Sequence, residues 1–146
     1  DLVPYIINIE KRMPEKVEYI GEISHAEVLQ WSADADLLFM LRDPVLPVNK
    51  YICGSKILES MMCGTAIIVN DGSSTANMVR RTNCGFVVNA HNVEEIVGVI
   101  NKLKNNPDMC VQLGINGRKA YDEIYSWNCM GDRLLKLYEK ILMRNI

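Results

Sequence analysis

Short apolar runs alternate with amphipathic stretches along most of this 146-residue sequence. Four of the apolar runs have the length of β-strands: Val17–Ile20, Asp36–Met40, Ala66–Val69 and Phe86–Val88. Three intervening stretches begin with a serine, which can cap free backbone N–H groups at the start of a helix: Ser24–Ala33, Ser55–Cys63 and Ser74–Thr82. Because parallel strands need a crossover between them, this order predicts a Rossmann-like α/β fold, a parallel sheet flanked by helices.

Both ends of the sequence are predicted to be helical. Leu2–Arg12, with Pro4 in its first turn, has the pattern of a helix that no strand precedes. Since each helix of a doubly wound sheet normally follows a strand, we expect the first strand of the sheet to lie upstream of Asp1. After the last strand, three stretches form a helical C-terminal tail: Asn92 to about Lys104, Pro107 to about Ile124, and Trp127–Met143.

The composition favours one globular domain and argues against two kinds of partner. The sequence is 49% hydrophobic and 23% charged, which is typical of a chain that buries a sizeable core. Sixteen basic and eighteen acidic residues leave no excess positive charge for a phosphate backbone, so nucleic acid is not an expected partner. The longest unbroken apolar run, Leu37–Leu41, is far shorter than the roughly 20 residues that cross a bilayer.

The five cysteines include no Cys-x-x-Cys pair, so their spacing fits neither a zinc site nor a disulfide framework. We therefore expect reduced thiols in a cytoplasmic protein. The sequence begins at Asp1, with neither an initiator Met nor a signal peptide, which indicates a segment of a longer protein.

The clearest functional signal lies in Asn49–Gly72, which combines a polar loop, a helix that opens at Gly54-Ser55, and a buried strand. In open α/β sheets, ligands bind beyond the carboxyl ends of strands, and this loop follows the predicted strand Asp36–Met40. The glycine lets the backbone come close to a ligand, and the first helical turn offers free N–H groups to an anion such as phosphate. Glu59, one turn later, could accept both vicinal hydroxyls of a ribose, or it could simply be an exposed residue that favours the helix dipole.

The run Ser55–Val69, with the sequence SKILESMMCGTAIIV, resembles the donor-site helix and strand of the family 4 retaining glycosyltransferases, which have the GT-B architecture. Other stretches agree with the family in their order: Gly21, Ala33–Asp36, Cys84–Val88, Asn92–Glu95, Gly117–Ala120 and Tyr125–Trp127. The resemblance covers nearly the whole chain. It implies that residues 1–146 are a single nucleotide-sugar-binding domain, the C-terminal half of a GT-B enzyme, without that domain's first strand and without the N-terminal acceptor domain.

The resemblance also implies roles for individual residues. The family signature holds two glutamates separated by seven residues, the first near the donor sugar and the second on the ribose. Glu59 matches the second, whereas Tyr51 stands in the place of the first. Gly54 matches the glycine between them, so the N–H groups of Ser55 and Lys56 are expected at the diphosphate. The Lys56 side chain could add a charge there or be an ordinary exposed lysine.

A turn earlier in the sequence is expected to lie along the nucleotide base. Gly21, Ile23 and Ser24 match the family's turn, which contacts the base chiefly through backbone groups. The same residues are also explained by a turn followed by a helix cap. Asn77 departs from the family, since relatives often have an acid at this position.

These matches imply a retaining glycosyltransferase that transfers a hexose from a nucleotide diphosphate sugar to a polysaccharide or lipid-linked acceptor. The acceptor would bind to the N-terminal domain, and the reaction would need no bound metal or other cofactor. Peripheral association of the full protein with the inner face of the membrane is left open, and no catalytic residue is assigned. Two alternatives remain: a non-catalytic GT-B-like interaction or regulatory module, which the departures at Tyr51 and Asn77 favour, and a GT-B sugar-nucleotide epimerase.

The remaining polar residues give weaker signals. His25 and His91 have no partner at metal-ligand spacing, and the sequence favours ordinary surface histidines. The Arg80-Arg81 pair is expected on a solvated helix face. Arg42, in the loop after the second predicted strand, is a better candidate for binding an anion.

Overall fold

A computed structural model of the chain describes residues 2–43 and 45–143. Its centre is a parallel sheet in the order β1-β2-β3, with strands β1 (Leu37–Met40), β2 (Ala66–Asn70) and β3 (Gly85–Val88). Strand β2 lies between the other two, and all of its residues are buried. The predicted parallel α/β sheet is therefore confirmed for three of its four predicted strands.

The helices follow the predicted order, and most begin and end within one residue of the expected positions. The structure contains α1 (Val3–Arg12), α2 (His25–Asp34), the 3-10 helix η1 (Pro47–Lys50), α3 (Ser55–Cys63), α4 (Ser74–Thr82), α5 (Val93–Lys104), α6 (Pro107–Ala120), the π-helical segment η2 (Tyr121–Tyr125) and α7 (Trp127–Met143). The long helix expected from Pro107 to about Ile124 is interrupted, because the chain widens into η2 after Ala120. There the Ser126 N–H donates to the Tyr121 carbonyl, five residues earlier, at 2.7 Å.

Helices cover both faces of the sheet. Successive side chains of a strand point to opposite faces, so Ile67 and Val69 of β2 pack against α3 and α4, whereas Ala66 and Ile68 pack against α5 and α6. The first core also includes Ile57 and Met61 of α3 and Val79 of α4, and the second includes Leu103 and Leu113. Helix α3 is thus fixed to the sheet along its buried side.

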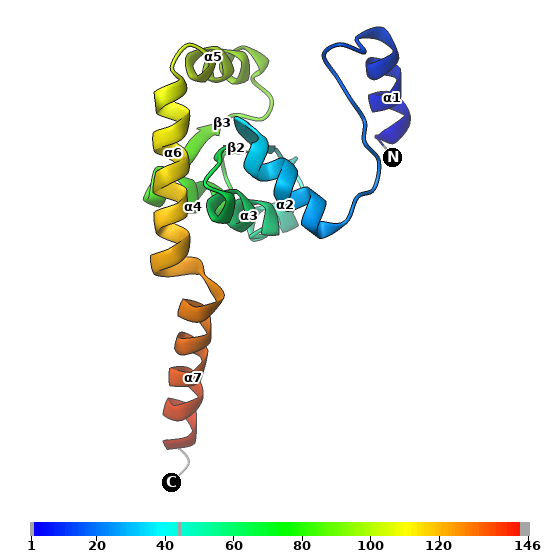
Figure 1. The fold of residues 1–146 in the computed structure, drawn as a ribbon. Helices are drawn as coiled ribbons and strands as arrows, with labels where there is room; N and C mark the ends of the chain where they lie inside the picture. Colours follow the sequence, from blue (N-terminus) through cyan, green and yellow to red (C-terminus); the bar gives the residue numbers. More distant parts are fainter. Residues whose placement is uncertain (1, 44, 144–146) are drawn as a thin grey trace.

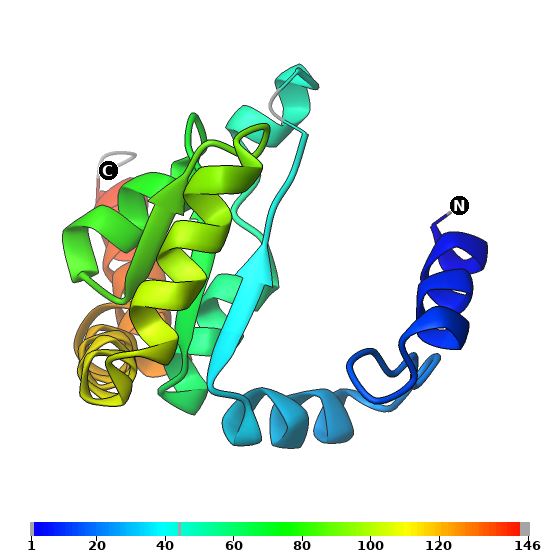
Figure 2. The same cartoon turned by 90° about the horizontal axis from the view of Figure 1, so that it is seen from above.

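The predicted strand Val17–Ile20 is wrong, because these residues have no regular secondary structure. A strand needs a hydrogen-bonded neighbour, and within the described residues no strand pairs with the outer edge of β1. The segment between α1 and α2 runs clear of the sheet in both views (Figures 1 and 2). Its backbone is instead tied to α1, since the Tyr19 N–H donates to Glu10 Oε1 at 2.9 Å.

The last helix, α7, extends away from the sheet (Figure 1), and no residue of it is buried. Its large apolar side chains along one stripe are exposed: Leu134, Leu135, Leu137, Tyr138, Ile141 and Leu142. No helix in residues 2–43 and 45–143 is both long enough and apolar enough to cross a membrane.

Candidate functional site

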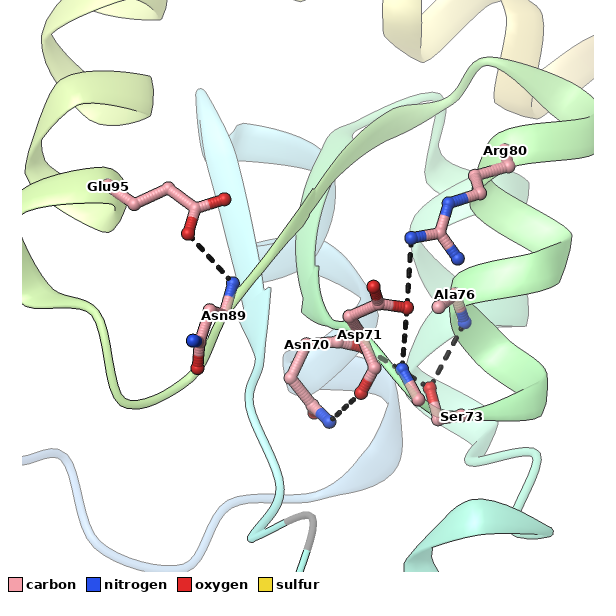
Figure 3. Close-up of polar contacts among 8 residues, drawn as sticks. Asn70, Asp71, Ser73, Ala76, Arg80, Asn89 and Glu95 are labelled. Atoms are coloured by element: carbon pink, nitrogen blue, oxygen red, sulfur yellow. Dashed lines mark hydrogen bonds and ion pairs between the residues drawn. The ribbon is translucent and has the colours of Figure 1, made fainter.

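The loop that leaves β1 is held at the carboxyl end of the sheet by Asn70, the last residue of β2. Asn70 is only 4% exposed, and its Oδ1 accepts a hydrogen bond from the Arg42 backbone N–H at 2.8 Å. Its Nδ2 donates to the Asp71 carbonyl at 2.9 Å (Figure 3). Because this buried amide pairs with two segments at once, it fixes the direction in which the chain leaves β1.

The rest of this loop is fastened to its own backbone and to α4. Buried Asn49 donates through Nδ2 to the Asp43 carbonyl at 2.7 Å. The hydroxyl groups of Ser74 and Thr75, in the first turn of α4, donate to the Ile52 carbonyl at 3.0 and 3.3 Å. These bonds deliver the chain to the start of α3 in a defined position.

Helix α3 begins without a side-chain cap. Its N-cap is Gly54, whereas Ser24, Ser73 and Asn92 cap α2, α4 and α5 with side-chain oxygens. The next residue, Ser55, is exposed. The first N–H groups of a helix have no partner within the helix, so this end of α3 is able to bind an anion.

Gly54 is needed for space rather than for an unusual backbone conformation, since its φ of -71° suits any residue. A Cβ at this position would lie 3.0 Å from Met40 Sδ and 3.2 Å from Arg42 Nη2. The glycine therefore allows the Arg42 side chain to approach the first turn of α3.

Glu59 lies one turn into α3 and points toward the start of α2. Its side chain is 16% exposed, and its Oε1 lies 3.4 Å from His25 Nε2. The start of α2 is fixed by a capping box, in which the Ser24 backbone N–H donates to Glu27 Oε2 and the Glu27 N–H donates to Ser24 Oγ. The loop before α2, which contains Gly21 with a φ of 71°, therefore leads to the side of α3 that carries Glu59.

A groove with a volume of about 600 Å³ lies beside the solvent-facing side of α3. Its polar lining residues include Ser55, Glu59 and His25, and the others are mainly apolar, aromatic or sulfur-containing: Cys53, Leu58, Met62, Met78, Tyr121, Tyr125, Trp127 and Met130. A groove that is mostly apolar, with a few polar groups at a helix N-terminus, has the character of a small-molecule site.

The family described as Glycosyl transferases group 1 matches residues 8–120 of this chain. The chain belongs to the group 1 glycosyltransferases. Among solved structures, the sucrose-phosphate synthase of Thermosynechococcus elongatus has the same fold, with a TM-score of 0.80 and 19% sequence identity. The match covers 98% of this chain and 34% of the synthase, which confirms the predicted resemblance to one half of a GT-B glycosyltransferase.

Two curated relatives match most of this glycosyltransferase domain. The alpha-maltose-1-phosphate synthase of Mycolicibacterium smegmatis is 28% identical over 88% of the chain. A GDP-mannose-dependent monoacylated alpha-(1-6)-phosphatidylinositol monomannoside mannosyltransferase of Corynebacterium glutamicum is 24% identical over 86% of it. The chain spans only 38% and 33% of these two relatives, respectively.

The glycosyltransferase domain brings some of the predicted donor-binding residues together and leaves others apart. Ser55 and Glu59 both line the groove. Lys56 is exposed at the first turn of α3, and Gly54 is buried beneath that turn. Tyr51, which is 76% exposed, does not line the groove, and the Lys50 ammonium lies 5.7 Å from the centre of its ring.

The loop residues predicted near the base, Gly21, Ile23 and Ser24, do not line the groove. The next residue, His25, does. The pairing of His25 with Glu59 was missed because the two residues are distant in the sequence, and no spacing pattern signals such a contact. His25 also differs from the expected unpartnered surface histidine, although its side chain is 72% exposed. Within the residues that the structure describes, no group of histidine, cysteine or acidic side chains could hold a metal ion.

Other polar side chains at the carboxyl end of the sheet are used by the fold itself (Figure 3). Asp71 Oδ1 accepts hydrogen bonds from the Gly72 N–H at 2.6 Å and from Arg80 Nη2 at 2.9 Å, and these bonds lower the pKa of Asp71. Beyond β3, Glu95 Oε2 accepts from the Asn89 N–H at 3.2 Å. Asp71 and Glu95 accept hydrogen bonds from backbone N–H groups and hold loops of the fold, whereas Glu59 contacts the exposed side chain of His25. Asp71 and Glu95 are therefore weaker candidates for binding a ligand than Glu59.

A second cavity, of about 460 Å³, lies at the other end of the sheet. It is lined by the residues where β1 and β2 begin, including Leu37 and Ala66, and by parts of α5 and α6, including Leu103 and Val111. Ligands of open α/β sheets bind at the carboxyl ends of the strands. We therefore take the groove beside α3 as the candidate site.

Proposed function

We propose that this chain is the nucleotide-sugar-binding half of a retaining glycosyltransferase. One arrangement carries this proposal. Helix α3 begins without a side-chain cap at the carboxyl end of a parallel sheet, and one turn later the largely buried carboxylate of Glu59 lines a groove. One end of this arrangement suits an anion and the other suits a polyhydroxyl group. A nucleoside diphosphate has an anionic diphosphate and a ribose with two vicinal hydroxyls, so it suits both ends.

The diphosphate would bind at the first turn of α3. The backbone N–H groups of Ser55 and Lys56 would donate to its oxygens, and the partial positive charge of the helix N-terminus would favour it. When the bond between sugar and phosphate breaks, negative charge grows on the leaving diphosphate. N–H groups that are already fixed in position stabilise this charge without reorganising, so the same contacts would lower the barrier to transfer.

The ribose would bind to Glu59. The two carboxylate oxygens can accept both vicinal hydroxyls of a ribose, and His25, at 3.4 Å, holds the carboxylate at the side of the groove. The nucleoside would then lie along the groove, with its base toward the turn of Gly21, Ile23 and Ser24. Because Glu59 is already mostly shielded from water, its bonds to a ligand compete less with solvent than those of an exposed acid.

The sugar and the acceptor are proposed at the level of chemical class. The relative from Corynebacterium is named for the use of GDP-mannose and the one from Mycolicibacterium for the synthesis of a sugar phosphate. These names support a hexose attached to a nucleoside diphosphate as the donor, and a glycan or lipid-linked sugar as the acceptor. The acceptor would bind outside this chain, and the exposed apolar stripe of α7 is suited to pack against such a further domain.

The protein would work in the cytoplasm, where nucleotide sugars are available, and a lipid-linked acceptor would bring it to the inner face of the membrane. No bound metal or cofactor is needed in this proposal, because α3 and its neighbouring cations supply the charge that a metal would otherwise provide.

One observation favours a second function, a non-catalytic module that binds a partner. Tyr51 stands where the family has its first signature glutamate, and its side chain projects into solvent rather than into the groove. A module that had lost glycosyl-transfer activity would keep the fold but would not need an intact donor site.

A thermal-shift screen of the purified full-length protein that contains this chain, with UDP, GDP and ADP and then with the sugar conjugates of the best binder, tests the proposal. We expect one nucleoside diphosphate to raise the melting temperature, because a ligand that binds only the folded state stabilises it. We also expect the matching nucleotide sugar to be consumed when an oligosaccharide or lipid-linked acceptor is added. A shift without consumption across an acceptor panel would favour the non-catalytic module, and no shift with any nucleotide would contradict a donor site.

A further inference from the structure

The Arg42 side chain reaches from the end of β1 to the first turn of α3. Its Nη2 atom lies 3.2 Å from the point where a Cβ on Gly54 would stand. The backbone of Arg42 is fixed by its hydrogen bond to the buried side chain of Asn70. The guanidinium is therefore held at the start of α3 by the loop geometry and by the absence of a side chain on Gly54.

This guanidinium has no acidic partner within residues 2–43 and 45–143. The close contacts between basic and acidic side chains in this part of the chain join His25 to Glu59, Arg80 to Asp71 and Arg118 to Asp122, and none includes Arg42. The Arg42 Nε atom is buried and has no hydrogen-bond acceptor. A cation next to the positive end of a helix is unfavourable by itself, and an unpaired buried donor adds to the cost. An anion bound at the start of α3 would offset the repulsion between the guanidinium and the helix N-terminus and would supply a hydrogen-bond acceptor.

We infer that Arg42 binds the diphosphate of the nucleotide sugar, together with the N–H groups at the start of α3. This inference rests on the proposed function and adds to it a residue whose sequence position gave only a weak indication. A guanidinium presents several N–H donors in a plane and matches the oxygens of a phosphate better than an ammonium does. Tyr51 leaves the position of the first signature glutamate uncharged, so no acid from that place competes for Arg42.

Isothermal titration calorimetry of the wild-type protein and of Arg42→Gln, with UDP and GDP and with the corresponding monophosphates, tests the inference. Loss of charged hydrogen bonds should weaken binding of the preferred diphosphate about tenfold or more. Binding of the monophosphate should change less, because it lacks one of the two groups that the guanidinium can reach. Arg81→Gln, which removes the same charge from an exposed site on α4, is the matched control and should bind like the wild type.

Two further variants separate a binding role from a structural one. Arg42→Lys should restore part of the affinity because it restores the charge. Gly54→Ala keeps Arg42 but places a methyl group against its guanidinium, so it should weaken diphosphate binding several-fold. Because the Arg42 Nε atom is unpaired in the ligand-free protein, Arg42→Gln should melt at or above the wild-type temperature.

The outcomes distinguish this inference from the proposed function. If the wild type binds a nucleoside diphosphate and Arg42→Gln binds it with the same affinity, the role of Arg42 is wrong and the donor site stands. A loss of affinity together with a large drop in melting temperature, not recovered in Arg42→Lys, would show a structural residue and also overturn the inference. If the wild type binds no nucleoside diphosphate, the proposed function fails, and the inference fails with it.

Discussion

The two ends of α3 are built differently. At the C-terminal end, Gly64 has a φ of 72°, the Ser60 hydroxyl donates to the Thr65 carbonyl at 2.6 Å, and Arg118 Nη1 donates to the Met62 carbonyl at 2.7 Å. Helix α6 packs directly against this end through Gly114. At the N-terminal end there is no side-chain cap, and the nearby Arg42 guanidinium has no acidic partner in the described chain.

This contrast separates residues that hold the fold from residues that are available to a ligand. The polar groups of the packed end are satisfied within the protein, so substitutions there should lower stability. At the open end, the start of α3 has no side-chain cap, Arg42 Nε has no hydrogen-bond partner, and Glu59 contacts the exposed side chain of His25. Substitutions there should therefore change binding and leave stability nearly intact. The following predictions test this division, beginning with the largest expected effect.

Gly114→Ala should destabilise the packed end most. A Cβ on Gly114 would lie 1.9 Å from the Gly64 carbonyl oxygen, so α6 would have to move away from α3. We expect a loss of about 3 kcal/mol or more in the free energy of unfolding, measured by urea titration. Gly98→Ala in α5, where a Cβ meets nothing within 4 Å, is the control and should stabilise by about 0.5–1 kcal/mol. Similar effects of the two substitutions would contradict the close packing.

Glu59→Ala should act mainly on binding. It removes the proposed acceptor of the ribose hydroxyls, so nucleoside diphosphate affinity should fall by about 1–3 kcal/mol in calorimetry. The unfolding free energy should hardly change, because the partner of Glu59, His25, is 72% exposed. Glu94→Ala on α5 removes an exposed acid outside the groove lining and should leave the affinity unchanged. Unchanged affinity in Glu59→Ala would count against a ribose role.

Gly64→Val compares the two ends of the helix directly. A β-branched residue is strained at a φ of 72°, so we expect a loss of about 2 kcal/mol in unfolding free energy. Gly54→Ala, at a φ of -71°, should cost less than half of that, since only flexible side-chain ends lie near its new Cβ. Equal losses in denaturant titrations would show that the N-terminal end is packed as tightly as the C-terminal end.

Asp71→Asn should have the smallest effect, and the effect should depend on pH. The hydrogen bond from the Gly72 N–H, together with Arg80, lowers the pKa of Asp71 in the folded state. Its contribution to stability is therefore present above the unfolded-state pKa and is lost as the pH falls through the lower folded-state pKa. The stabilities of wild type and Asp71→Asn, measured at neutral and at strongly acidic pH, should differ slightly at neutral pH and converge in acid. A difference that grows in acid would contradict this assignment.

Local patterns were sufficient to predict most of the fold. The bounds of α3 and the cap at Ser24 each depend on residues close together in sequence, and the structure confirms them. The strand at Val17–Ile20 failed because pairing depends on a neighbouring strand, which the local pattern cannot supply.

The candidate site was only partly predictable for the same reason. Glu59 and the start of α3 follow from spacing along one helix. The contact of Glu59 with His25 joins two helices, and the approach of Arg42 to Gly54 joins a loop to a helix. Both contacts arise from tertiary packing, so the sequence indicated the residue types but not their pairing.

The most direct test of the open end of α3 is a crystal structure of the protein with its preferred nucleoside diphosphate bound. The account predicts phosphate oxygens within hydrogen-bond distance of the Ser55 and Lys56 N–H groups, and ribose hydroxyls on the Glu59 carboxylate. A diphosphate bound elsewhere, with Glu59 still in contact with His25 alone, would contradict it.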